Sequence, residues 1–160
     1  MKKTVLILTL ILIITSVFAK ELTCPPADQL EISRFVINGT VSEVNFVETL
    51  AGRDYYNAKI SLEDIRMGKL LELDSLQRVD ARLDLPKFKE QGFVNVKFSD
   101  IALQFENPDA QYIKGEQVKV YLRSDTYSKE LRTQLGECGK VLIKKAPLWN
   151  RITAFFKRLF

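Results

Sequence analysis

The sequence contains no histidine among its 160 residues. This absence excludes Ser-His-Asp and Cys-His nucleophile systems, zinc sites with histidine ligands, and pH switches that depend on an imidazole. The sequence also lacks a glycine-rich phosphate loop and a Ser-x-x-Lys motif. Because the common catalytic and cofactor-binding arrangements are missing, we predict a protein that is not an enzyme and that uses no cofactor.

Carboxylates are the remaining groups that could act in catalysis or bind a hard cation. They occur as three close pairs: Glu63 with Asp64, Asp80 with Asp84, and Glu106 with Asp109. None of these stretches has the density of oxygen ligands that a calcium loop requires. Mixed charges on an exposed strand face are common, so we expect these acids to face solvent and predict no metal site. A hydrolase that uses paired carboxylates is our third hypothesis for function.

The first residues resemble a targeting segment rather than part of a folded domain. Lys2 and Lys3 precede an apolar run, and Val17 and Ala19 are small residues at the two positions that a signal peptidase recognises. We predict that residues 1–19 are a signal peptide and that the mature chain is secreted or extracytoplasmic. The alternative is an uncleaved anchor, but residues 4–19 as a helix would span about 24 Å, less than a hydrocarbon core of about 30 Å.

Cysteine is nearly as scarce as histidine, since the chain has only Cys24 and Cys138. Disulfides persist outside the cytoplasm, so we predict a structural bridge between these two residues. An intermolecular bridge or two free thiols are the alternatives. Neither cysteine belongs to a Cys-x-x-Cys motif, which gives a redox role little support.

The positive charge of the chain is concentrated at its C-terminus. Residues 140–160 contain no acid and six cations, which are Lys140, Lys144, Lys145, Arg151, Lys157 and Arg158. The rest of the predicted mature chain, residues 20–139, has 16 cations and 20 acids. A basic segment suits nucleic acid, an anionic membrane or an acidic protein. Export disfavours the first, so we expect no nucleic-acid partner.

Most of the mature chain has the pattern of β-strands. We predict five strands, at residues 34–47, 56–62, 79–85, 94–105 and 118–122, from β-branched or alternating apolar residues. Gly39 within the first strand indicates a bend or bulge, and so does a phase slip near residues 99–100. Tyr127, Leu131 and Leu135 have helical spacing and predict a short helix after the last strand. The fold class is therefore all-β, a five-stranded antiparallel barrel formed by residues 20–139.

Two of these strands carry a family resemblance. Ile37-Asn-Gly39-Thr-Val41-Ser-Glu-Val44 is similar to the first strand of OB-folds, and Lys114 to Val120 resembles their closing strand. The resemblance implies an OB-like barrel in which the first strand coils at its glycine. An exported OB-like domain with one cysteine near its start and another past its last strand is similar to netrin-like domains, including the tissue inhibitors of metalloproteinases. The family usually has more cysteines, and the inhibitors begin with a cysteine, whereas Cys24 would be the fifth mature residue.

Asn38-Gly39-Thr40 has the form of an N-glycosylation acceptor in an exported chain. Its predicted position inside a strand is less accessible than a loop. We therefore treat Asn38 as a possible acceptor only.

The last residues predict an amphipathic helix. On a helical wheel, one arc of about 140° holds Leu148, Trp149, Ile152, Phe155, Phe156, Leu159 and Phe160. The other face is basic, and Pro147 favours helix initiation. Apolar and cationic residues sorted in this way are typical of a helix in a membrane interface. The alternatives are docking on the protein's own barrel or on a protein partner.

These observations favour a non-enzymatic binding or scaffolding module at the outer face of a membrane. Residues 140–160 would form the basic amphipathic segment, with Lys144, Lys145, Arg151, Lys157 and Arg158 on its charged side. The alternative is a secreted netrin-like protease inhibitor or ligand-binding domain.

Overall fold

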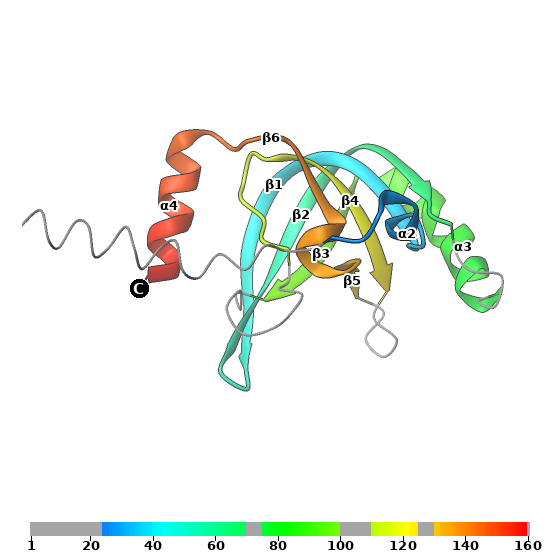
Figure 1. Cartoon of the computed structure of the whole chain (residues 1–160), viewed down its shortest axis with the longest axis horizontal. Helices are drawn as coiled ribbons and strands as arrows, with labels where there is room; N and C mark the ends of the chain where they lie inside the picture. Colours follow the sequence, from blue (N-terminus) through cyan, green and yellow to red (C-terminus); the bar gives the residue numbers. More distant parts are fainter. Residues whose placement is uncertain (1–23, 70–74, 100–109, 125–129, 160) are drawn as a thin grey trace, which may run out of the picture.

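The protein is mostly β, as the alternating patterns indicate. The computed structural model describes residues 24–69, 75–99, 110–124 and 130–159, which form an antiparallel sheet with a few short helices (Figure 1). The predicted signal peptide, the strand continuation at residues 101–105, and Tyr127 lie outside the described residues. The strands are β1 (Phe35–Leu50), β2 (Arg53–Met67), β3 (Phe93–Ser99), β4 (Gln117–Ser124), β5 (Leu131–Thr133) and β6 (Lys140–Lys144).

The predicted strand alternation accounts for the core. Ala58 and Ile60 of β2 are buried, and so are the alternating apolar residues of β3 and β4, which are Val94, Val96, Phe98, Val118, Val120 and Leu122. These side chains meet Phe35, Ile37 and Val41 of β1 in one cluster. Each strand therefore buries one face, as a period of two requires.

Gly39 marks a bulge, as predicted. The register between β1 and β2 shifts between Asn38 and Gly39, and a Cβ at this position would collide with the backbone carbonyl oxygen of Ser61. Only glycine allows the two backbones to approach this closely. The bulge helps β1 to bend and to pair with β2 on one side and β4 on the other.

The sheet is strongly curved but is not closed by backbone pairing among the described residues. Its order is β3-β2-β1-β4-β5, and β6 pairs with β4 as well. The two ends of this path approach each other, because Nζ of Lys97 in β3 lies 3.2 Å from Oε1 of Glu130, beside β5. The closed barrel that we expected is therefore not established.

The predicted strand at residues 79–85 is wrong. These residues belong to α3 (Ser75–Gln91), which includes Pro86. The helix covers one end of the sheet because Ala81, Leu85 and Phe88 follow helical spacing and pack against the core. Arg34 anchors it through an ion pair with Asp84 at 2.5 Å, and the ring of Phe88 meets that of Phe35 edge-on.

The predicted helix around Leu131 and Leu135 is also wrong. Leu131 and Thr133 are buried in β5, which pairs with the end of β4, and Leu135 has a positive φ of 54° that ends the strand. Pairing with β4 overrides a spacing that suits a helix locally. The short 3₁₀ helix η1 (Gly136–Gly139) follows.

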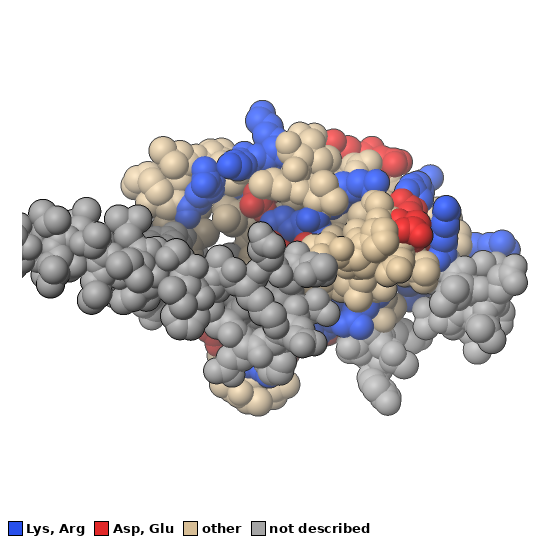
Figure 2. Space-filling view, in the orientation of Figure 1, with Lys and Arg blue, Asp and Glu red and all other residues tan. Residues whose placement is uncertain are grey.

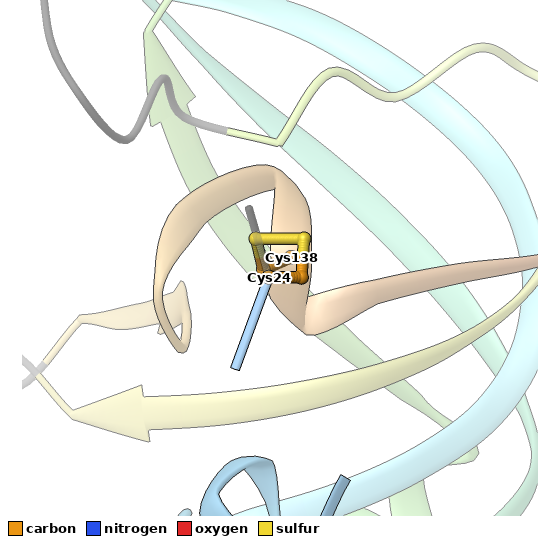
Figure 3. The surroundings of a disulfide bond; sticks show 2 residues. All are labelled: Cys24 and Cys138. Atoms are coloured by element: carbon orange, nitrogen blue, oxygen red, sulfur yellow. A yellow bond between two sulfur atoms is a disulfide. The ribbon is translucent and has the colours of Figure 1, made fainter. Parts of the chain in front are cut away.

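The predicted disulfide is present. Cys24 and Cys138 are bonded with their Cα atoms 5.3 Å apart, and Figure 3 shows the bridge at the turn of η1. Beside it, the short helix α2 (Ala27–Leu30) contributes Leu30 to a small second cluster with Val36 and Tyr121. The bridge thus fixes the start of the described chain to the segment that leads into β6.

Candidate functional site

The C-terminal arm, defined here as residues 141–159, is the most unusual surface of the molecule. It consists of most of β6, a short connection, and α4 (Leu148–Leu159). We expected residues 140–160 to form one basic helical segment, whereas residues 140–144 pair with β4 and extend the sheet. The helix starts only after Pro147, whose fixed φ suits the first turn.

Lys140 separates the arm from the body. Its ammonium group donates to Oε2 of Glu116 at 2.7 Å and to the carbonyl oxygen of Gln111, and the side chains of Lys140 and Glu116 are both buried. The Glu116 carboxylate also accepts a hydrogen bond from the backbone N–H of Ile113. The charge of Lys140 is therefore neutralised within the body, and it contributes nothing to the basic surface of the arm.

The described contacts between α4 and the body are made at the start of the helix. The Asn150 amide donates to the carbonyl oxygen of Lys114 at 2.8 Å, and Pro147 packs against Gly115. Gly115 has a φ of +90°, and a Cβ there would lie 2.8 Å from Cδ of Pro147. These contacts fix where the helix begins without covering its apolar face.

The apolar face of α4 is exposed wherever its side chains are described. Leu148 is 68% exposed, Trp149 75% and Ile152 37%. Val141, Leu142 and Ile143 of β6 are exposed as well. The side chains of Phe155, Phe156 and Leu159, and all of Phe160, lie outside the described part. Leu148 and Trp149 are therefore not docked on the protein's own sheet.

Positive charge borders this apolar surface. Lys144, Lys145 and Arg151 are exposed, and none forms an ion pair with an acid that the structure describes. Figure 2 shows Lys and Arg side chains where β6 leads into α4, beside an uncharged stretch of the helix. The side chains of Lys157 and Arg158 lie outside the described part. The arm thus combines exposed apolar residues with cations that have no described counter-charge.

The remaining predicted residues do not gather into a site. Asn38 lies near the start of β1, between β2 and β4, and is partly buried rather than on a loop. Glu63 accepts hydrogen bonds from Thr40 and Gln117, and Asp84 pairs with Arg34. Glu106 and Asp109 lie outside the described residues. Within the described ranges, no three His, Cys, Asp or Glu residues form a group that could hold a metal.

A polar groove at the open seam of the sheet was not predicted. It has a volume of about 240 Å³ and is lined by Asn57, Phe88, Gln91, Asn95, Lys97, Glu130 and Leu131. Hydrogen bonds from Lys97 to Glu48 and to Glu130 raise the pKa of the lysine. Since both carboxylates are already engaged, the groove has no free ionised group aimed at a ligand. No sequence signal identifies it, because it depends on the approach of β3 and β5.

A second apolar surface that we did not predict lies at the tip of the β1–β2 hairpin. Phe46 is 57% exposed, Val47 43% and Leu50 59%. The strand that we predicted at residues 34–47 is present as β1, which continues to Leu50 before a turn at Ala51 and Gly52. The exposure of these side chains could not be predicted, because strand sequences look alike whether or not a second layer covers them.

Among the residues that the structure describes, no helix is both long and apolar enough to cross a bilayer. Comparisons with protein-family models, curated proteins and solved structures found no match. The proposal for function therefore depends on the geometry and chemistry described above.

Proposed function

We propose that this protein is an exported, non-enzymatic binding or scaffolding module that attaches to an anionic membrane surface through α4. The main support is the exposure of Leu148 and Trp149 on a helix whose described contacts with the body come from its first turn. A large apolar side chain in water is unfavourable, and burial of each contributes about 1.5 to 3 kcal/mol. A bilayer interface accepts such a helix along its length.

The charge of the arm supports an anionic surface in particular. Five cations remain once Lys140 is excluded: Lys144, Lys145, Arg151, Lys157 and Arg158. Each cation near an anionic lipid surface contributes about 1 kcal/mol at moderate salt. A purely hydrophobic partner would explain the apolar residues of α4 but not this concentration of one sign of charge.

Flotation with vesicles tests this proposal. We expect the purified protein to float with vesicles of phosphatidylglycerol and phosphatidylcholine, to float at least tenfold less with phosphatidylcholine alone, and to lose most binding when residues 147–160 are removed. Equal flotation of the intact and shortened chains would exclude α4 as the attachment. A variant that retains the helix but carries Arg151→Glu and Lys157→Glu should lose the preference for anionic lipid and keep weak binding to both vesicles.

We also propose that the body is an OB-like barrel with an open seam. The support is a first strand that bends at Gly39, pairing of that strand with both β2 and β4, and the approach of β3 and β5 at Lys97 and Glu130. This arrangement leaves the arm outside the barrel, as an addition to it.

A netrin-like inhibitor or ligand-binding domain is the second candidate. The bridge between Cys24 and the turn after β5 supports it, because it ties the start of the chain to the end of the barrel. Sequencing of the mature N-terminus tests the inhibitor mechanism. A chain that starts at Lys20 would exclude capture of a protease zinc by a cysteine amine, since Cys24 would then be internal.

A further inference from the structure

The distal part of the β1–β2 hairpin is the longest projection of the described sheet. β4 accompanies β1 only as far as Thr40, and β3 accompanies β2 only as far as Tyr55. Among the described residues, only the last two pairs, Thr49 with Asp54 and Leu50 with Arg53, therefore belong to these two strands alone. A two-residue turn at Ala51 and Gly52, with φ of 52° and 75°, closes the hairpin tightly.

The hairpin tip, defined as residues 46–51, is apolar and nearly neutral in charge. Phe46, Val47 and Leu50 are its exposed large side chains. Glu48 within it is paired with Lys97 at 3.0 Å, and Asp54 just behind it accepts a hydrogen bond from Thr49 at 2.5 Å. Isolated apolar residues on a surface are ordinary, but three exposed ones within five residues at the end of one projecting hairpin indicate an interaction surface.

The hairpin and the arm start from the same place. The backbone N–H of Gly115 donates to the carbonyl oxygen of Val41 in β1 at 2.7 Å, while Lys114 and Gly115 hold Asn150 and Pro147 at the start of α4. From this common base, Figure 1 shows the hairpin and α4 both running toward the lower left. The hairpin extends about 30 Å beyond Val41, and α4 about 18 Å.

We propose that the hairpin tip enters the same membrane as α4 and forms a second attachment that depends on apolar burial rather than on charge. This inference rests on the proposed function of α4. The shared base and direction are the argument for a membrane as the occupant, because a helix that lies flat in the interface keeps a hairpin that starts beside it and runs alongside it close to the same surface. Phe46, Val47 and Leu50 would enter the interface, and the paired Glu48 would stay behind them.

Tryptophan quenching tests the tip and the helix separately, because Trp149 is the only tryptophan of the chain. The first protein is the unchanged chain, which reports on α4. The second carries Trp149→Phe with Leu50→Trp, and reports on the tip. The third, a matched control, carries Trp149→Phe with Leu83→Trp; Leu83 is 71% exposed on α3, on the opposite side of the molecule (Figure 1). Each is mixed with phosphatidylglycerol and phosphatidylcholine vesicles with brominated acyl chains.

We expect bromine to quench the indoles at positions 149 and 50 and to leave the indole at position 83 unquenched. Quenching at 149 without quenching at 50 overturns the inference and leaves the proposed function intact. Quenching at 50 without quenching at 149 supports the tip and overturns the role of α4. If no indole is quenched, the inference about the tip and the proposed role of α4 are both overturned. If the indole at position 83 is quenched as strongly as the one at position 50, binding is not oriented through the tip and the inference is overturned.

Measuring how the full chain partitions onto vesicles shows how much the tip contributes to binding. Leu50→Ser should weaken binding of the full chain to these vesicles by about five- to tenfold, while Leu83→Ser changes it less than twofold. The effect of Leu50→Ser should persist at 0.5 M salt. At that salt concentration the attraction between the cations and the anionic lipid is screened beyond roughly a few ångströms. An effect of Leu50→Ser below twofold would overturn the inference.

Discussion

The body and the C-terminal arm treat the same kinds of residue in opposite ways. In the body, Phe35, Ile37 and Leu122 are fully buried, and cations such as Lys97 and Lys140 are paired with carboxylates. In the arm, Leu148 and Trp149 are exposed, and Lys144 and Lys145 pair with no described acid. The body thus buries and pairs these residues within the chain, whereas the arm leaves its own exposed.

Loss of the disulfide should have the largest effect on the body. The bridge closes a loop with a sequence separation of 114, so replacement of both cysteines by serine should reduce the free energy of unfolding by about 4 to 5 kcal/mol. Urea denaturation of Cys24→Ser with Cys138→Ser measures this effect. Because α4 is held through Asn150 and Pro147, vesicle binding at temperatures where the variant is folded should remain within twofold. Loss of binding by the folded variant would contradict the separation of the two regions.

A matched pair of leucine substitutions compares the two regions directly. Leu122→Ala removes a fully buried side chain from β4 and should cost about 2 to 5 kcal/mol of unfolding free energy. Leu148→Ala removes one that is 68% exposed and should change it by less than about 0.5 kcal/mol. Vesicle partition should reverse the order, with a larger loss for Leu148→Ala. A cost above 1 kcal/mol for Leu148→Ala would mean that α4 docks on the body.

The smallest expected effect concerns acid stability. Arg66 donates a hydrogen bond to Glu31 at 2.7 Å, and this bond lowers the pKa of the carboxyl from its ordinary value of 4.5. The unfolded state then binds more protons, so the contribution of Glu31 is present above pH 4.5 and is lost as the pH falls through the lowered pKa. For a surface pair it should not exceed about 1 kcal/mol.

Unfolding of the unchanged protein and of Glu31→Gln, followed from pH 7 to pH 2, checks this sign. The difference in stability between them should shrink toward acid pH. A difference that grows as the pH falls would contradict the assignment.

The strands with visible alternation could be predicted from the sequence, and others could not. In β2, β3 and β4 the apolar residues of the buried face occupy every second position, and this alternation is visible in the sequence. Residues 79–85 also alternate, but Ala81, Leu85 and Phe88 share a helical face, and contact with the core decides in favour of the helix. β5 has only three residues and pairs with β4, the strand that precedes it in the sequence. Three residues are too few to show an alternation, so this strand leaves no clear signal in the sequence.

The candidate site could be predicted only in part. The separation of apolar and basic residues in the tail depends on one helix only, so a helical wheel drawn from the sequence is enough to predict α4. Residues 140–144 look equally basic in sequence, yet they form a strand, and Lys140 is buried against Glu116. The exposed hairpin tip depends on how far β3 and β4 accompany their neighbours, which alternation within a single strand does not indicate.

The position of the disulfide also has a consequence for biosynthesis. Cys24 leaves the ribosome 114 residues before its partner, which at about 5 to 20 residues per second is a delay of roughly 6 to 23 s. During that time its thiol is without its native partner and is open to other oxidants. Cys138 in turn precedes every residue of α4, so the bond that closes the body does not include the helix. The closure of the body thus depends on how long the first thiol stays available, and not on the helix that follows the second.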